Sequence, residues 1–507
     1  MNTLTLIAPS GEQSIPFLPG ETLLAALRRA GLAPDAPCGG RGTCGKCRVT
    51  LREPDGSERT VSACAVSARD DMIVLAPERA DMDVLQPAAA PFEERRTSGA
   101  VYAAADIGTT TVACLLTDGE GRVLDSVGEG SAQSAFGADV IARIQAAAGE
   151  QTALTAAVRT QLARMLSTLC ARRGLSPETP GGMAVAGNTT MLHLLAGLSP
   201  ESIGVAPYRP LSRFGAEVPA GELGLPLRGK VYLCPAVSGY VGGDITADLL
   251  ALDADRWEKP ALLVDVGTNG EMAIGCGKRF VCCAAAAGPA FEGAQIACGM
   301  TAAPGAVTAV TLCDGALGVE VYGGGPARGL CGSGLMDAAA VMLELGAMLP
   351  DGRILNPERD ELPPAARPYL TLRDGKPVFV LAPEVYVTQK DIRSLQLGKA
   401  AIAAGIALLL DEWTARGGKR PETLLLAGGF GSHLRPESAA RIGMIPAFLL
   451  PGARAVGNTA ALGAALAAPS DANRARLAAL AEHMDYVELA ELPAFNDRFV
   501  EEMGFPI

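Results

Sequence analysis

The segment Leu262-Leu263-Val264-Asp265-Val266-Gly267-Thr268 is an apolar run that ends in an Asp-x-Gly-Thr turn, and it repeats the plan of Ala103-Ala104-Ala105-Asp106-Ile107-Gly108-Thr109. A second apolar run follows each turn, as in a β-hairpin. Another phrase recurs in the same order: Gly187-Asn188-Thr189 follows the first turn and Gly457-Asn458-Thr459 follows the second. Two ordered matches in each half predict a duplicated α/β fold.

The two Asp-x-Gly-Thr turns have the composition of a phosphate-binding hairpin. Glycine lets the backbone approach a phosphate, hydroxyls and amides donate to its oxygens, and aspartate can hold Mg2+, usually through water. Two such hairpins that face each other would clamp the phosphates of a nucleotide. Tight β-turns also recruit these residue types for geometry alone, and this alternative weighs most against a single copy.

A third glycine turn occurs late in the chain. Leu424-Leu425-Leu426-Ala427 has the composition of a buried strand, and it runs into Gly428-Gly429-Phe430-Gly431. Such a turn leaves room for adenosine to lie against the backbone, although most Gly-Gly turns are only turns. Its place between Asp265 and Gly457 favours a role in nucleotide binding.

Four cysteines lie near the N-terminus with the spacing Cys38-x5-Cys44-x2-Cys47-x16-Cys64, and glycines separate the first three. A chain needs such glycines to wrap tightly round an iron-sulfur cluster and to point amides at its sulfurs. The surrounding pattern predicts a hairpin, a short helix and returning strands, which resembles the β-grasp of [2Fe-2S] ferredoxins. Zinc remains the alternative, because four cysteines that include a C-x2-C also bind zinc tetrahedrally.

The composition disfavours several classes of protein. Charged residues make up 19% of the chain and the net charge is −12, which opposes the counterion release that drives nucleic-acid binding. Residues 1–17 lack the pattern of a signal peptide, and the uncharged stretch 293–313 contains a proline and several glycines that suit no lipid-facing helix. Thirteen cysteines without a secretion signal indicate reduced thiols or metal ligands. We therefore expect a cytoplasmic protein that binds neither nucleic acid nor a membrane.

The 507 residues are enough for about three or four domains. We predict an α/β multidomain chain that begins with a β-grasp [2Fe-2S] ferredoxin-like domain in residues 1–77. A linker in 78–99 follows, because this stretch is rich in proline and charge and has little periodicity. The two halves of a duplicated α/β domain then occupy 100–258 and 259–467, and 468–507 form a C-terminal extension.

The order of these motifs resembles that of the acetate and sugar kinase, Hsp70 and actin superfamily. This resemblance implies that the duplicated α/β domain is an RNase H-like ATPase domain. With a ferredoxin-like domain in front, the chain looks like the ATP-dependent reductive activators of corrinoid proteins. The resemblance covers about residues 1–77 and 100–467. It includes four further motifs: Ala186-Gly187-Asn188-Thr189-Thr190-Met191, Gly288-Pro289-Ala290-Phe291-Glu292-Gly293-Ala294, Cys331-Gly332-Ser333-Gly334 and Thr388-Gln389-Lys390-Asp391-Ile392-Arg393.

The resemblance implies that ATP drives one electron from a [2Fe-2S] cluster to Co(II) of a corrinoid protein, which regenerates Co(I) in a methyltransferase system. It also implies Mg2+, an external low-potential electron donor and a homodimer.

The site residues follow from the motifs and the resemblance together. Glu271 would orient the attacking water, and a solvent-facing strand glutamate is the alternative. The expected cluster ligands are Cys38, Cys44, Cys47 and Cys64. The expected phosphate loops are Asp106, Gly108, Thr109 and Thr110, and then Asp265, Gly267, Thr268 and Asn269, with Gly428, Gly429 and Gly431 beside adenosine.

Three other functions stay open. An activator of 2-hydroxyacyl-CoA dehydratases would share the ATPase fold but hold a [4Fe-4S] cluster between two subunits. A nucleotide-sensing scaffold with structural zinc would turn nothing over, and a small-molecule kinase would have no use for a ferredoxin domain. Four further cysteines crowd an apolar region, where buried free thiols are commoner than a second cluster: Cys276, Cys282, Cys283 and Cys298.

Overall fold

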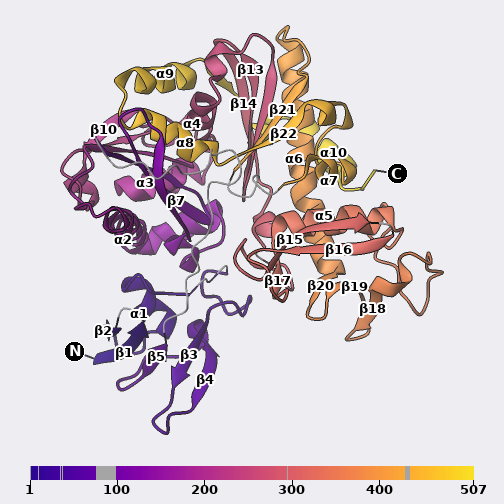
Figure 1. Cartoon of the computed structure of the whole chain (residues 1–507), viewed down its shortest axis with the longest axis horizontal. Helices are drawn as coiled ribbons and strands as arrows, with labels where there is room; N and C mark the ends of the chain where they lie inside the picture. Colours follow the sequence, from indigo (N-terminus) through magenta and orange to yellow (C-terminus); the bar gives the residue numbers. More distant parts are fainter. Residues whose placement is uncertain are drawn as a thin grey trace.

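The computed structural model describes residues 2–8, 11–34, 36, 38–75, 99–293, 295–313, 315–428 and 434–506. These residues form a small N-terminal domain and a larger body in which two α/β halves stand side by side (Figure 1). The predicted linker lies outside the described residues except for Gly99.

The N-terminal domain is a five-stranded mixed sheet with one helix. Its elements are β1 (Asn2–Ala8), β2 (Gly11–Phe17), α1 (Leu23–Arg29), β3 (Arg48–Arg52), β4 (Glu58–Ser62) and β5 (Ile73–Leu75). The strand order is β2-β1-β5-β3-β4, and the first and last strands pair in parallel at its centre. Leu4 and Leu6 alternate into a core shared with Leu24 and Leu27 of α1. This arrangement is the predicted β-grasp.

The first half of the larger body is a six-stranded sheet with flanking helices. Its elements are β6 (Tyr102–Ile107), β7 (Thr111–Thr117), β8 (Val123–Gly130), α2 (Val140–Arg172), β9 (Gly182–Gly187), α3 (Thr189–Ala196), β10 (Ala216–Pro219), β11 (Lys230–Leu233) and α4 (Gly243–Ala251). The strand order is β10-β11-β9-β6-β7-β8, with β6 to β8 antiparallel and β9 parallel to β6. The first Asp-x-Gly-Thr turn therefore lies at the carboxyl end of a central strand.

The second half repeats this topology. Its elements are β12 (Ala261–Val266), β13 (Gly270–Cys276), β14 (Arg279–Ala285), α6 (Gln389–Ala415), β21 (Thr423–Ala427), α7 (Pro436–Arg441), β22 (Ala453–Gly457), α8 (Thr459–Ala467) and an edge strand, β23 (Met484–Tyr486). The order β22-β21-β12-β13-β14-β23 matches that of the first half, strand for strand, from β11 to β8. The predicted duplication is confirmed, with the two Asp-x-Gly-Thr turns at equivalent positions.

The repeated Gly-Asn-Thr phrase does not mark equivalent positions, so this part of the sequence argument was wrong. The first copy joins β9 to α3, whereas the second joins β22 to α8. The counterpart of β22 in the first half is β11, not β9. Both asparagines are helix N-caps: the Asn188 side chain accepts from Thr190 N and the Asn458 side chain from Ala461 N. The phrase recurs because each strand-to-helix turn needs a cap.

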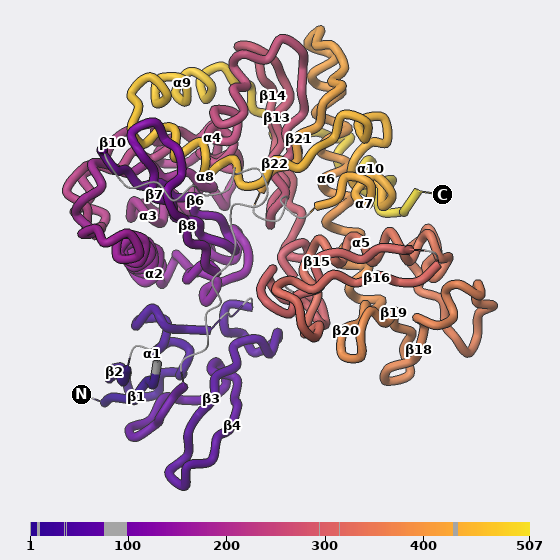
Figure 2. The backbone as a smooth tube through the Cα atoms, viewed as in Figure 1, coloured from indigo at the N-terminus to yellow at the C-terminus, as the bar shows by residue number. Residues whose placement is uncertain are grey.

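A long insertion separates β14 from α6. It contains β15 (Ala306–Cys313), β16 (Ala316–Val321), β17 (Gly329–Leu330), α5 (Gly332–Glu344), β18 (Leu370–Arg373), β19 (Lys376–Ala382) and β20 (Val385–Thr388), in two three-stranded sheets. Figure 2 shows this insertion projecting from the second half. After α8, the chain continues through α9 (Asp471–Glu482) to β23 and ends with α10 (Ala494–Glu501). Because β23 pairs with β14, the C-terminal extension completes the second sheet.

Helix α6 has 27 residues and is long and apolar enough to span a membrane, but 72% of its most apolar window is buried inside the protein. A buried apolar helix of this kind is a core element. Its start is a capping box, in which Thr388 accepts from Asp391 N and the Asp391 carboxylate accepts from Thr388 N.

Candidate nucleotide and iron-sulfur sites

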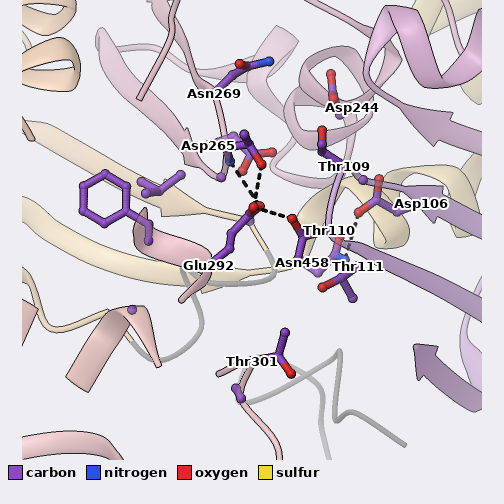
Figure 3. A pocket seen from close by; sticks show the side chains of 18 of the residues that line it. Asp106, Thr109, Thr110, Thr111, Asp244, Asp265, Asn269, Glu292, Thr301 and Asn458 are labelled. Atoms are coloured by element: carbon purple, nitrogen blue, oxygen red, sulfur yellow. Dashed lines mark hydrogen bonds between the residues drawn. The ribbon is translucent and has the colours of Figure 1, made fainter. Parts of the chain in front are cut away.

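The two Asp-x-Gly-Thr turns face each other across a cavity of about 140 Å³ that is partly open to solvent. In Figure 3, Asp106 and Asp265 approach this cavity from opposite halves of the molecule. Every described residue that the sequence assigned to the nucleotide lines it: Asp106, Gly108, Thr109, Thr110, Asp265, Gly267, Thr268, Asn269, Glu271 and Gly428. The remaining two, Gly429 and Gly431, lie outside the described residues.

Glu292 joins the two turns to each other. Its carboxylate accepts a hydrogen bond from the Thr110 hydroxyl of the first half and, at 2.5 Å, from the Thr268 hydroxyl of the second. The Thr268 amide donates to the other carboxylate oxygen at 3.1 Å. Burial raises the pKa of Glu292, and these hydrogen bonds oppose that rise. Hydroxyls and an amide that bind a carboxylate also bind phosphate oxygens, so the site is built for an anion.

Carboxylates crowd the floor of the cavity. Asp106 accepts from the Asn458 side chain at 3.0 Å, and burial together with the nearby Asp244 raises the pKa of Asp106 to about 7. Burial also raises the pKa of Asp265, with Asp244 and Asp106 adding to it. A divalent cation with oxygen ligands fits this donor set, because carboxylate and amide oxygens are the ligands that Mg2+ prefers.

Glu271 is buried rather than exposed, with 7% of its surface accessible. It lies on β13 and accepts from the side chains of Asn188 and Asn269, both at 3.2 Å. Burial, Asp244 and Asp265 raise the pKa of Glu271. The solvent-facing alternative is therefore wrong, and the carboxylate is held in the cavity by two amides from opposite halves.

Gly428 closes the cavity where β21 ends. Its φ is +103°, and a Cβ at this position would overlap Asp265 Oδ1 and lie 2.8 Å from Val266 O. The residue must therefore be glycine for the turn after β21 to touch the second phosphate loop.

The four N-terminal cysteines lie as two pairs. The sulfurs of Cys38 and Cys44 are 3.3 Å apart, and the Cys47 and Cys64 thiols interact with each other. Within the described chain, no three or more His, Cys, Asp or Glu side chains converge as ligands of one metal ion. Two pairs fit a cluster of two irons with two thiolates each.

The loop that carries these cysteines has the predicted backbone. Four of its glycines have positive φ, from +64° to +87°: Gly39, Gly40, Gly42 and Gly45. Although burial opposes ionisation, hydrogen bonds from the Cys44 thiol and from the amides of Cys44 and Thr43 lower the pKa of Cys38 to about 6. Amides aimed at a sulfur stabilise a thiolate ligand, so the loop fits an iron-sulfur cluster.

The other cysteines behave as buried thiols. Cys282 and Cys283 are fully buried on β14, and burial raises the pKa of each. Cys276 and Cys298 are partly exposed and lie on different elements. The burial of Cys282 and Cys283 supports packing as the role of these two thiols.

Several residues of the cavity were not assigned from the sequence. The motif that contains Glu292 was recognised from the sequence, but no role was predicted for this residue. Asp244 belongs to no motif that the sequence reveals. Asp248 does not line the cavity; it is fully buried on α4 and accepts from the Thr459 hydroxyl of α8 at 2.6 Å. Asn188 and Asn458 were quoted only as part of a repeat. Their contacts with Glu271 and Asp106 cross between the halves, which no sequence pattern encodes.

Family models match three stretches of the chain. They are a 2Fe-2S iron-sulfur cluster binding domain over residues 7–70, the RACo middle region over 102–256 and the C-terminal ASKHA domain of RACo over 259–507. Together with the strand topology, they confirm the predicted fold, a [2Fe-2S] β-grasp domain joined to an ASKHA-type domain. A [2Fe-2S] domain also argues against the structural-zinc alternative.

The chain is similar to curated relatives and to solved structures. The corrinoid activation enzyme RamQ of Eubacterium limosum is 31% identical over 414 residues, which are 79% of this chain and 69% of that protein. The [Co(II) methylated amine-specific corrinoid protein] reductase of Methanosarcina barkeri is 29% identical over 244 residues, 43% of this chain and 41% of the relative. The structure of a reductive activator for a corrinoid, iron-sulfur protein covers 99% of this chain and 98% of its own, with 26% identity and a TM-score of 0.73.

Proposed function

The chain belongs to the family of corrinoid activation enzymes, and we propose that it uses ATP to reduce a corrinoid protein from Co(II) to Co(I) in a methyltransferase system. The activity combines an iron-sulfur reductase with an ATPase. The observation that carries the proposal is the combination in one chain of a paired four-cysteine loop with two facing Asp-x-Gly-Thr turns.

We assign the electron carrier to Cys38, Cys44, Cys47 and Cys64. The paired thiols and the amides around Cys38 support this assignment. The bound [2Fe-2S] cluster would supply one electron at a potential near roughly −400 mV. The loop contributes thiolates, a partly buried environment and amide dipoles that hold negative charge.

We assign phosphate binding to Gly108, Thr109 and Thr110 on one side and to Gly267, Thr268 and Asn269 on the other. Gly428 borders the nucleotide, and we extend this role to Gly429 and Gly431. Asp106 and Asp265 would hold Mg2+ through water, and the metal ion would offset the phosphate charge during hydrolysis.

We assign to Glu271 the role of orienting the attacking water. Its burial and the two amides that fix it, from Asn188 and Asn269, support this role.

The need for ATP follows from the reduction potentials. Co(I) of a protein-bound corrinoid is expected to be a stronger reductant than a [2Fe-2S] centre, so the electron moves uphill. A deficit of roughly 100 mV leaves only a few per cent of an acceptor reduced at equal donor, because ~59 mV is tenfold for one electron. Nucleotide binding that favours one docked state can change that balance.

The partner is a corrinoid protein, and an external low-potential donor would reload the cluster. We propose that the protein works in the cytoplasm as a homodimer, without nucleic acid or a membrane. A net charge of −12 favours a partner that presents a basic surface.

Anaerobic purification, followed by iron and sulfide analysis and a visible spectrum, tests the first half of the proposal. About two irons and two sulfides per chain, with a band that bleaches on reduction, are expected. The reduced protein is then mixed with a Co(II) corrinoid protein with and without Mg·ATP, and formation of Co(I) is followed by absorbance. Stoichiometric zinc without colour, or equal Co(I) formation without ATP, would contradict the proposal.

The Asp265→Ala variant separates the two halves of this assay. Its cluster should be intact while ATP hydrolysis and corrinoid reduction are lost. Unchanged hydrolysis would remove the aspartate from the phosphate site.

A further inference from the structure

The N-terminal domain contacts both halves of the ATPase through two basic side chains. Arg28 Nε of α1 donates to Ala135 O at 2.8 Å, and the guanidinium lies 4.9 Å from the centroid of the Phe136 ring. Lys46, within the cluster loop, donates to Gly299 O at 3.4 Å. Ala135 belongs to the first half and Gly299 to the second. Whether the N-terminal domain can make both contacts at once therefore depends on the relative orientation of the two halves.

The contact with the first half reaches the cluster loop itself. The Ala36 amide donates to Ser134 O at 3.3 Å, and a Cβ on Gly39 would lie 3.3 Å from Phe136 O. Arg28 is 9% exposed and also pairs with Glu150 of α2 at 3.5 Å. A buried guanidinium that loses such partners is costly, so Arg28 is the main attachment point of this interface.

The segment that receives Arg28 is bonded directly to the first phosphate loop. Ser131 N donates to Thr110 O at 2.6 Å, only a few residues before Ala135. Arg143, fully buried on α2, donates to the Thr109 carbonyl and, at 3.4 Å, to Ser131 Oγ. The backbone of the first phosphate loop and the segment 131–136, which contacts Arg28, are thus joined by hydrogen bonds.

A second short segment makes the same connection in the other half. Glu292 lies in the nucleotide cavity between Thr110 and Thr268, and Gly299, on the same segment, receives Lys46. Met300 then lines the cavity again. Each half therefore has one segment that touches the nucleotide site at one end and the iron-sulfur domain at the other.

ATP phosphates and the Glu292 carboxylate need the same donors, the Thr110 and Thr268 hydroxyls and the Thr268 amide. Two anions do not share these three donors, because like charges in a partly buried site repel. We propose that the iron-sulfur domain stays docked on both halves while Glu292 bridges Thr110 and Thr268, and that ATP releases this docking by displacing Glu292. The inference rests on the proposed function, because it takes the cavity to be the ATP site.

Release of the iron-sulfur domain would expose the cluster loop to the corrinoid protein. In the docked arrangement Gly39, next to Cys38, lies against Phe136, so this side of the cluster loop is covered by the ATPase. A corrinoid protein must bring its cobalt close to the cluster to accept an electron. ATP binding would uncover the carrier at the moment when the ATPase is loaded.

Hydrogen-deuterium exchange on the full, cluster-loaded chain tests the proposal, with nucleotide binding measured in parallel by calorimetry. Three states are compared: no nucleotide, Mg·ADP and a non-hydrolysable Mg·ATP analogue. The analogue should speed exchange at the Ala36 amide and in the peptide 131–136 by about tenfold, since an interface that opens exposes those amides. Exchange in α9, which lines neither the nucleotide cavity nor the interface with the N-terminal domain, is the internal reference.

Arg28→Gln and Glu292→Gln test the two contacts on which the proposed release depends. Arg28→Gln should show the fast exchange without nucleotide, whereas Arg29→Gln, one residue along α1 and paired with Glu21 inside the domain, should behave as the parent protein. Glu292→Gln keeps an acceptor but removes the charge, so it should bind the analogue several-fold more tightly and lose protection at Ala36. The visible spectrum of each variant reports that the cluster domain is folded.

The outcomes distinguish the inference from the proposed function. Analogue binding by calorimetry without any change at Ala36 or 131–136 would overturn the inference and leave the proposed function standing. Protection in Arg28→Gln equal to that in Arg29→Gln would overturn it as well. No nucleotide binding at all would overturn the proposed function and the inference with it.

Discussion

The Cys44 thiol completes one of the two sulfur pairs, 3.3 Å from Cys38. Cys44→Ser should remove the cluster, because one iron would keep a single thiolate and a hydroxyl is a poor ligand for it. ATP binding should be unchanged, since the nucleotide cavity is lined by other elements. Iron analysis and the visible spectrum measure the first effect, and calorimetry with an ATP analogue measures the second.

Cys313→Ser is the matched control, because Cys313 is exposed and lies outside the paired cysteines. It should keep iron and colour. Normal corrinoid reduction by Cys44→Ser would rule out the cluster as the electron carrier.

Asp106 should make nucleotide binding depend on pH. Burial and Asp244 raise the pKa of Asp106 to about 7, and burial raises the pKa of Asp244 to about 6. Only the ionised carboxylate holds Mg2+, so affinity for Mg·nucleotide is present above the pKa and lost as pH falls through 7. We expect about a tenfold loss between pH 8 and pH 6, measured by calorimetry.

Asp106→Asn should bind weakly and lose most of that pH dependence, because an amide does not titrate. An equal pH dependence in the variant would assign the titration to another group.

These residues show how far the sequence could lead. The aspartates and threonines of the two turns were found because their spacing is local, and the structure places all of them around one cavity. Glu292 was not found, because its partners, Thr110 and Thr268, lie in different halves and are joined only by the fold. Asn458 was not found for the same reason: it donates to Asp106, which lies in the other half.

Gly428, directly after β21, lies against the second Asp-x-Gly-Thr turn. Gly428→Ala would place a methyl group against Asp265 Oδ1 and also strain a residue with φ of +103°. Strain of this kind costs on the order of 1–3 kcal/mol, and pushing Asp265 aside should weaken nucleotide binding by about tenfold or more. Thermal unfolding and calorimetry give the two quantities.

Gly417→Ala is the control for strain alone. Its φ is +78°, and no atom lies within 4 Å of the added Cβ. It should lose stability and keep nucleotide affinity. Equal affinities in the two variants would separate Gly428 from the nucleotide site.

Elements were predicted best where the signal is periodic and local. The β-grasp strands and α1 follow from alternating Leu4 and Leu6 and from a helix face with Leu24 and Leu27. The insertion of β15 to β20 was not predicted, because short strands that pair only with one another leave weak patterns.

The two halves meet along α4 and α8, one helix from each, and this contact sets the width of the nucleotide cavity between them. Thr459 of α8 donates to Asp248 of α4 at 2.6 Å. A Cβ on Gly463 would overlap the Ala247 carbonyl, so the helices approach closely only because that residue is glycine.

Gly463→Val should therefore force α4 and α8 apart and act on the whole molecule. Overpacking of this kind costs about 1–3 kcal/mol, and separation of the halves should weaken ATP-analogue binding, because the analogue must reach both phosphate loops at once. The cluster spectrum should not change, since the N-terminal core is separate. Gly221→Val, where the added Cβ meets no atom within 4 Å, is the control and should keep parental affinity. Calorimetry and thermal unfolding on both variants decide the matter, and parental affinity in Gly463→Val would show that the α4–α8 contact does not set the nucleotide site.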